Sequence, residues 1–165
     1  MPAMQIAKLA LKQGHLGLCA LPGRENDYVG DLTALTLFAP HLVLSLVQIH
    51  EYQRHGPALM ADLAAHGIAQ IRFPIRDFGT PNSALWPPLS IQLHAILAKG
   101  QSVLIHCLAG CGRTGTIALR LMIESGEDPN AALVRLRQAR PCAVETKAQL
   151  RWATGFQNRS SKRPR

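Results

Sequence analysis

The sequence is poor in aromatic and charged residues, and it has no long apolar run. Aromatic residues make up 5% and charged residues 17% of the 165, whereas 47% are hydrophobic. This balance favours a folded core over intrinsic disorder, and the length suits one domain. We expect no membrane span, because no segment is long and apolar enough. The start of the chain lacks the basic-then-apolar pattern of a secretory signal.

Acidic residues are scarce towards the C-terminus. The net charge is +8, and residues 135–165 carry nine Lys or Arg but a single acid, Glu145. Two interpretations remain open: a solvated helix face followed by a loose tail, or a positive field that attracts anionic substrates, lipids or nucleic acid. We expect residues 1–157 to form the single domain and residues 158–165 to be a basic, disordered tail.

The apolar pattern predicts an α/β fold. Strands are expected at 42–47, 71–75 and 103–106, in the centre of the sheet, and a hairpin over 5–20 at its edge. Pro74 places the second of these strands at an edge or an end. Helices are expected over 26–38, 57–66, 84–99 and 129–139, after Arg113, and around Leu150. The expected fold has three layers, with a short, mostly parallel central sheet flanked by helices.

One stretch organises the chain, His106-Cys-Leu-Ala-Gly-Cys-Gly-Arg-Thr114 between two apolar runs. It predicts a strand, a tight loop and a helix, so that free backbone N–H groups bind an anion at the helix N-terminus. Cys107 is expected near this positive helix end, where the nucleophilic thiolate is favoured. Arg113 offers a planar fork for two phosphate oxygens. A thiolate beneath a phosphate cradle indicates covalent phosphoryl transfer.

This His-Cys-x5-Arg-Thr pattern resembles the signature loop of the cysteine-dependent protein tyrosine and dual-specificity phosphatases. The resemblance implies that Cys107 forms a phosphocysteine intermediate, Arg113 binds the phosphoryl oxygens, Thr114 assists the leaving sulfur and His106 supports the loop. It also implies that no metal or cofactor is needed. The phosphate-binding residues it implies are Leu108, Ala109, Gly110, Cys111, Gly112 and Arg113.

Two further residues belong to this interpretation. Asp77 follows a predicted strand, thirty residues before Cys107, in an Asp-x-Gly-x-Pro segment that resembles the family's mobile general-acid loop. Asp77 is the candidate acid for the leaving group, although it could simply cap a turn. Gln149 follows an Arg-Pro-Cys-Ala segment that is similar to the family's Arg-Pro-Gly-Ala. It is either the residue that orients the hydrolytic water or a plain surface residue.

The sequence therefore predicts a cysteine-dependent phosphatase acting on phosphotyrosine or phosphoserine/threonine protein. The alternatives are a phosphoinositide or RNA 5′-phosphatase, a rhodanese-like sulfurtransferase and an inactive phosphate-binding module. The substrate is expected to be a phosphorylated protein or another anionic phosphate ester. The location is expected to be cytoplasmic, because a free catalytic thiol needs a reducing compartment.

The remaining chemistry-bearing residues are given structural roles. The spacing of Cys19, Cys107, Cys111 and Cys142 matches neither a disulfide framework nor a zinc site. Cys111 and Cys142 are expected to pack as small apolar side chains, with the alternative that either traps an oxidised Cys107. Glu51, close to two histidines, matches no strong metal site, so these polar side chains are expected to be exposed.

Overall fold

The computed structural model describes residues 4–155. Within them the strands are β1 (Ala7–Leu11), β2 (Gly14–Cys19), β3 (Leu42–Ser45), β4 (Ala69–Arg72) and β5 (Ser102–His106). The helices are α1 (Tyr28–Phe38), α2 (Ile49–His55), α3 (Leu59–Ala65), α4 (Trp86–Ala98), α5 (Gly112–Glu124), α6 (Pro129–Ala139) and α7 (Lys147–Thr154). No helix of this part of the chain is both long and apolar enough to cross a membrane. The predicted tail, 158–165, lies outside the described residues.

One five-stranded sheet organises the fold, in the order β1-β2-β5-β3-β4. Only the β1–β2 hairpin pairs antiparallel, while β2, β5, β3 and β4 run parallel. All five residues of β5 are buried, as expected for the central strand of a sheet covered on both faces. The parallel strands end at one edge of the sheet, so the segments that follow β3, β4 and β5 meet there.

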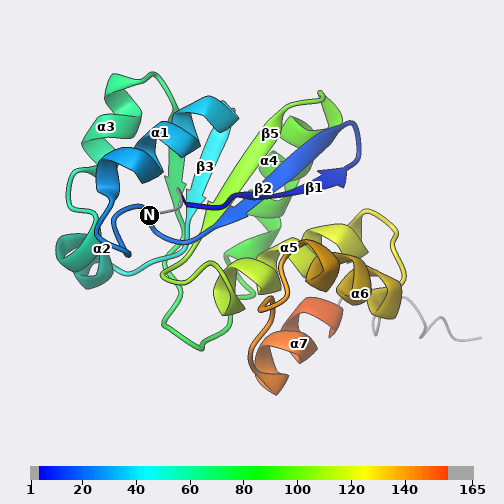
Figure 1. Cartoon of the computed structure of the whole chain (residues 1–165). Helices are drawn as coiled ribbons and strands as arrows, with labels where there is room; N and C mark the ends of the chain where they lie inside the picture. Colours follow the sequence, from blue (N-terminus) through cyan, green and yellow to red (C-terminus); the bar gives the residue numbers. More distant parts are fainter. Residues whose placement is uncertain (1–3, 156–165) are drawn as a thin grey trace, which may run out of the picture.

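Helices flank this sheet, as the sequence predicts. In Figure 1, α4 lies behind β2 and β5, and α5, α6 and α7 form a group together. Helix α5 is buried from Gly112 to Leu119 and again from Leu121 to Ile123, which fixes the loop at its N-terminus. On β2, a Cβ at Gly17 would come within 2.6 Å of the Phe38 ring of α1, so glycine permits this close packing.

Two details differ from the sequence-based expectation. The strand expected at 71–75 is β4, which spans residues 69–72. It lies at the edge of the sheet, as expected from Pro74. The spacing of apolar residues over 26–38 predicts Val29 on the buried side of α1, but Val29 is 76% exposed. The buried polar residue there is Asp31, whose carboxylate accepts a hydrogen bond from the Gly23 amide at 2.9 Å. This bond to the preceding turn sets the face that α1 buries.

A polar cluster joins α4 to the C-terminal end of α5. The Glu124 carboxylate accepts hydrogen bonds from Trp86 Nε1 at 2.7 Å, Arg120 Nε at 2.7 Å and the Ser90 hydroxyl, and it lies 3.1 Å from His94 Nε2. Burial opposes ionisation of Glu124, but these partners outweigh it and lower its pKa to about 2. The charged form of Glu124 is therefore the one that the fold stabilises.

This cluster predicts an acid-dependent loss of stability. A folded-state pKa below the unfolded value contributes stability that is present above pH 4.5 and lost as the pH falls towards about 2. We expect Glu124→Gln to lower the free energy of unfolding by about 3 kcal/mol at pH 7, with the difference shrinking below pH 4.5. Urea unfolding across pH measures it, with the exposed Glu25→Gln as control. A difference that does not depend on pH would contradict the assignment.

Candidate active site

Cys107 lies where the central strand ends and the signature loop begins. It follows β5 directly, is 2% exposed and is a free thiol. The loop leads into α5, whose N-cap is Cys111. Among the described residues, the amide N–H groups of 108–111 donate to no acceptor within the protein. The strand, loop and helix predicted from the sequence are thus present, with amides left over to bind an oxyanion.

Gly110 allows this loop to pack against the end of β2. Its φ is +71°, and a Cβ there would lie 2.3 Å from the carbonyl oxygen of Cys19. Next to it, the Leu21 amide donates to the Leu108 carbonyl at 3.1 Å. No other residue type fits at Gly110 without moving the backbone. The loop is therefore fixed from the β2 side.

Arg113 is almost fully buried and is held by groups from two segments, α2 and the loop after β4. Its Nη1 and Nη2 atoms donate to the two oxygens of Glu51 at 2.9 and 2.7 Å. Nη1 also donates to the carbonyl of Ile75 at 3.0 Å, and Nη2 lies 3.3 Å from Oδ1 of Asp77. Among the described residues, Arg113 Nε has no partner. That N–H is available to a phosphoryl oxygen.

The electrostatics of Arg113 connect it to the reactive thiol. Burial of the guanidinium works against its charge, but the hydrogen bonds to Glu51 raise its pKa. The negative charges of Cys107 and Asp77 act on the Arg113 pKa in the same direction. Arg113 therefore stays protonated between a nucleophile and a carboxylate, which is the arrangement that a phosphoryl group requires.

Glu51 corrects the sequence-based expectation. It was expected to be exposed, yet it is 6% exposed and lies in the first turn of α2, at the edge of the sheet where β3 ends. Burial raises the pKa of Glu51, but the Arg113 hydrogen bonds and the Gln48 amide outweigh burial and lower it. Only one feature of the sequence points to this role, the position of Glu51 shortly after a buried parallel strand. Among the described residues, no three His, Cys, Asp or Glu form a metal-ligand group.

Asp77 lies on the loop after β4, as predicted, and faces Arg113. Its side chain is half exposed, at 49%, so it can reach both the site and solvent. Oδ1 also accepts from the amide of Phe78 at 3.0 Å, and the amide of Gly79 donates to the Arg76 carbonyl at 2.8 Å. Asp77 therefore takes part in a local turn as well as facing the site, and its acid role stays a prediction.

Gln149 is fully buried, so the alternative of a plain surface residue is wrong. Its Oε1 accepts from the amides of Glu145 at 2.9 Å and Thr146 at 3.1 Å, and its own amide donates to the Thr146 hydroxyl at 3.0 Å. Its Nε2 donates to the carbonyl of Gly79 at 3.1 Å, two residues after Asp77. Gln149 thus links the start of α7 to the loop of the candidate acid.

His106 and Thr114 are both buried at the base of the loop. His106 Nδ1 lies 3.2 Å from the carbonyl of Cys107. Burial lowers the pKa of His106 to about 4, against the opposing effect of that carbonyl, so the ring is neutral at pH 7. The Thr114 hydroxyl is buried with no partner among the described residues. The assistance that the resemblance implies for it at the leaving sulfur stays a prediction.

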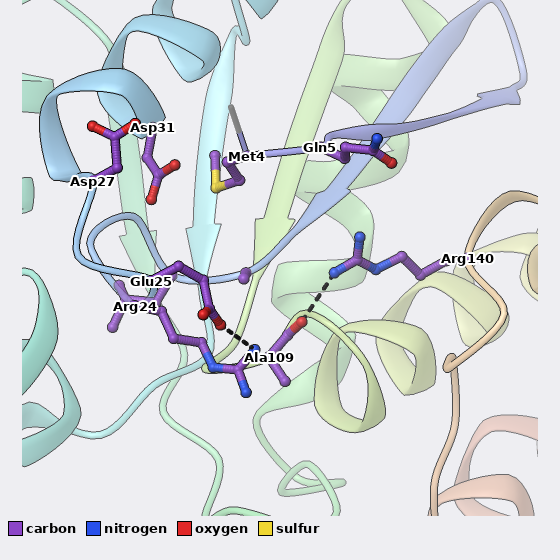
Figure 2. A pocket seen from close by; sticks show the side chains of 10 residues that line it. Met4, Gln5, Arg24, Glu25, Asp27, Asp31, Ala109 and Arg140 are labelled. Atoms are coloured by element: carbon purple, nitrogen blue, oxygen red, sulfur yellow. Dashed lines mark hydrogen bonds and ion pairs between the residues drawn. The ribbon is translucent and has the colours of Figure 1, made fainter. Parts of the chain in front are cut away.

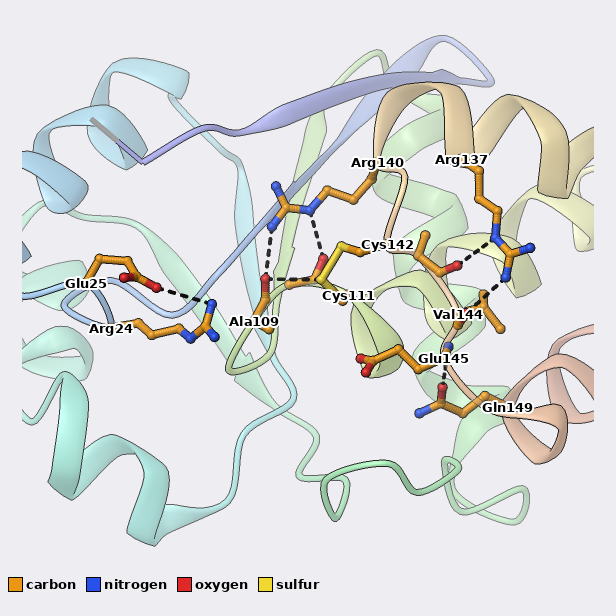
Figure 3. Close-up of a disulfide and its surroundings, with 12 residues drawn as sticks. Arg24, Glu25, Ala109, Cys111, Arg137, Arg140, Cys142, Val144, Glu145 and Gln149 are labelled. Carbon is orange, nitrogen blue, oxygen red and sulfur yellow. Dashed lines mark hydrogen bonds and ion pairs between the residues drawn. A yellow bond between two sulfur atoms is a disulfide. The ribbon is translucent and has the colours of Figure 1, made fainter. Parts of the chain in front are cut away.

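Cys111 and Cys142 form a disulfide, which corrects the expectation of two packed thiols (Figure 3). The alternative, in which either one traps Cys107, does not describe this structure, because Cys107 is free. Cys142 is an exposed residue on the segment between α6 and α7. On the same segment Arg140 donates to the carbonyls of Ala109 at 2.9 Å and Gly110 at 3.0 Å. Three successive loop residues are therefore fastened to one segment.

A hollow of about 170 Å³ lies beside the loop (Figure 2). Ala109 forms one wall, and Arg24 and Arg140 form others. Arg24 pairs with Glu25 at 3.4 Å, so the hollow carries both signs of charge. Neither the reactive thiol nor the buried guanidinium lines it. The hollow is a neighbour of the phosphate loop, not the cradle itself.

Comparisons with known proteins agree with this geometry. The family model described as "Polymorphic toxin system, DSP-PTPase phosphatase" matches residues 26–127, more than half of the chain. The proteins named cyclin-dependent kinase inhibitor 3 from Rattus norvegicus and Homo sapiens are each 28% identical over 153 residues, which cover 87% of this chain and 72% of theirs.

Solved phosphatase structures share the fold. Kinase associated phosphatase, crystallised with its catalytic-site cysteine replaced by serine, superposes with a TM-score of 0.86 at 24% identity, over 99% of both chains. PTPMT1 in complex with PI(5)P gives 0.72 at 18% identity, over 94% of this chain and 97% of that one. The chain belongs to the DSP-PTPase phosphatase family. It is a cysteine-dependent phosphatase, a hydrolase of phosphate monoesters.

Proposed function

We propose that the chain hydrolyses phosphate monoesters in two steps through a phosphocysteine at Cys107. In the first step the thiolate attacks phosphorus, so that an S–P bond forms and the P–O bond to the leaving group breaks. Asp77 gives its proton to the leaving oxygen. The observation that carries this proposal is the contact between Asp77 and the buried Arg113, 3.3 Å apart beside the free thiol.

Arg113 and the loop amides supply the positive charge for this step. The negative charge of the transferring phosphoryl group lies on its equatorial oxygens, and enzymes stabilise it mainly by positioned donors. The free Arg113 Nε and the unused amides of 108–111 provide such donors. Glu51 acts as a positioning residue, because its bidentate contact fixes the plane of the guanidinium.

In the second step water attacks phosphorus and the S–P bond breaks. Asp77, now ionised, takes the proton from water, and Cys107 leaves as a thiolate with the Thr114 hydroxyl beside it. Gln149 remains our candidate for orienting this water. Its Nε2 donates one hydrogen to the Gly79 carbonyl, so the second hydrogen of that NH2 group remains for the water.

The acid role of Asp77 predicts a dependence on the leaving group. We expect Asp77→Asn to lower kcat by about 100-fold for an alkyl phosphate but only a few-fold for p-nitrophenyl phosphate, whose leaving group needs no proton. Steady-state kinetics across a series of phenyl and alkyl phosphates measures the trend. Asp128→Asn, the same change at the N-cap of α6, where asparagine also accepts the capping hydrogen bond, is the control. Equal slowing of all substrates would remove the acid role.

We propose phosphorylated protein, on tyrosine or on serine/threonine, as the substrate class. Its support is the similarity to kinase associated phosphatase. The complex of PTPMT1 with PI(5)P keeps a phosphoinositide as the alternative, and the same chemistry extends to RNA 5′-phosphates. A panel of phosphopeptides, inositol lipids and 5′-phosphorylated RNA tests this proposal. Preferred turnover of lipid or RNA would overturn it.

Two expectations remain proposals. The basic C-terminal region is proposed to contact anionic lipid or nucleic acid. The cytoplasm is the proposed compartment, because the Cys107 thiol must stay reduced. The rhodanese-like and inactive alternatives gain no support from a site that pairs Arg113 with a candidate acid at 3.3 Å. Thiosulfate turnover without phosphatase activity would support the rhodanese-like alternative.

A further inference from the structure

The two cysteines of the phosphate loop differ in oxidation state. Cys107 is a free thiol at 2% exposure, whereas Cys111, four residues later in the same loop, is oxidised in a disulfide with Cys142. The catalytic step proposed above uses only Cys107. The disulfide therefore ties the phosphate loop to another segment and has no part in the catalytic steps.

The disulfide is the covalent member of a larger clamp on the loop (Figure 3). Arg140 holds the carbonyls of residues 109 and 110, and the Val144 amide donates to the Cys111 carbonyl at 3.3 Å. The carbonyl and amide of a peptide bond turn together, so holding the carbonyls outward directs the neighbouring amides towards the phosphate. The clamp thus sets the direction of the donors that bind the phosphoryl group.

The same segment also reaches the acid loop. It continues from Val144 into the cap of α7, where Gln149 donates to the Gly79 carbonyl at 3.1 Å. A Cβ on Gly112 would lie 3.1 Å from the Gln149 amide nitrogen, so this side chain also adjoins the phosphate loop. Fastening the segment at Cys142 therefore stabilises both halves of the site together.

The two sulfurs differ in how they respond to a reductant. Cys142 is exposed, whereas Cys111 is half-buried at the N-cap of α5. An attacking thiolate therefore reaches the sulfur of Cys142, and the Cys111 thiolate is expelled next to the positive end of the helix, which stabilises it. Both accessibility and the leaving group favour this one direction of attack.

We propose that Cys111 and Cys142 form a thiol–disulfide switch that controls phosphate binding, in which the bonded form is the active one. A dithiol reductant attacks Cys142, forms a mixed disulfide and releases Cys111. Its second thiol then displaces Cys142, so that two electrons and two protons pass to the protein and the reductant leaves as a cyclic disulfide. The loop keeps its three hydrogen bonds but loses its covalent tie. The proposal rests on the phosphatase function assigned above.

The test follows wild-type protein through a series of reduced and oxidised dithiothreitol ratios. We expect kcat/KM for p-nitrophenyl phosphate to fall on the order of tenfold, in step with the opening of the bond as measured by mass spectrometry. Activity is expressed per free Cys107, counted by alkylation, so that protection of the catalytic thiol does not mask the effect. Activity that stays constant while the bond opens would overturn the switch.

Two variants complete the test. Cys142→Ser should have the lower activity of the reduced wild type at every dithiothreitol ratio. Ala148→Ser, a change at an exposed residue in the first turn of α7, should keep the wild-type response. A Cys142→Ser variant as active as the oxidised wild type would also overturn the proposal, as would protein purified without reductant in which both thiols are free to alkylation.

A binding measurement separates this proposal from the phosphatase mechanism. In Cys107→Ser, which has no catalytic thiol, tungstate should bind on the order of tenfold more weakly after reduction. If the wild-type protein had no phosphatase activity but Cys107→Ser still bound tungstate in a redox-dependent way, the proposed mechanism would be refuted and the switch kept. If the wild-type protein were an active phosphatase and the tungstate affinity of Cys107→Ser did not change on reduction, the switch would be refuted and the mechanism kept.

Discussion

Replacing Cys107 with serine lowers kcat for p-nitrophenyl phosphate by about 10⁴-fold or more, because a serine hydroxyl is not ionised at neutral pH. The same variant still binds tungstate, since the loop amides and the Arg113 Nε that face an oxyanion are unchanged. Steady-state kinetics and titration calorimetry measure the two effects. Loss of turnover with retained binding distinguishes a missing nucleophile from a damaged cradle.

The other free cysteine provides the matched control. Cys19 lies fully buried on β2, and burial raises the pKa of its thiol, so it stays protonated and unreactive. We expect Cys19→Ala to keep kcat within a few-fold of wild type. A Cys107→Ser protein that keeps more than about 1% of wild-type activity would contradict the thiolate mechanism.

Replacing Arg113 with lysine lowers kcat/KM by about 10³-fold, the effect of losing a preorganised oxyanion donor. A lysine keeps the charge but offers no planar fork. It therefore cannot hold both oxygens of Glu51 at 2.9 and 2.7 Å and also present an N–H to phosphate. The loss should appear in tungstate affinity as well as in kcat/KM, because both depend on the same donors.

Two variants on α2 separate charge from geometry at this pair. Glu51→Gln keeps an acceptor for the guanidinium but removes the charge, and we expect an intermediate loss of about tenfold. Arg54→Lys changes an exposed arginine on the same helix and should leave kcat/KM unaltered. If Arg113→Lys were as active as Arg54→Lys, the bidentate geometry would play no part in catalysis.

The sequence predicts those parts of the site whose interacting residues are close together in the chain. The loop amides belong to residues 108–111, directly after Cys107 in the chain, so the short pattern between two apolar runs is enough to predict them. Asp77 was found because it follows a strand, and all parallel strands end at the same edge. The helix expected over 84–99 is present as α4, and its Trp86 is 3% exposed and hydrogen-bonds Glu124 at the C-terminal end of α5.

The residues that the sequence missed depend on long-range partners. Glu51 meets Arg113 across 62 positions, and a buried carboxylate cannot be distinguished from an exposed one until that partner is placed. Cys111 and Cys142 lie 31 positions apart, with the helices α5 and α6 between them. The packing of these helices brings the two Cα atoms to 5.1 Å. Gln149 is buried for the same reason, because its acceptor Gly79 is 70 positions away.

The central claim is that one sulfur carries the phosphoryl group between the two steps. Asp77→Asn should slow the release of phosphate from Cys107, because water then lacks its base. Acid-quenched reactions of this variant with ³²P-labelled p-nitrophenyl phosphate, followed by peptide mapping, test the claim directly. The account predicts label on the peptide that contains Cys107 and none in a protein that also carries Cys107→Ser. Label on any other residue, or a burst of p-nitrophenol without labelled protein, would contradict it.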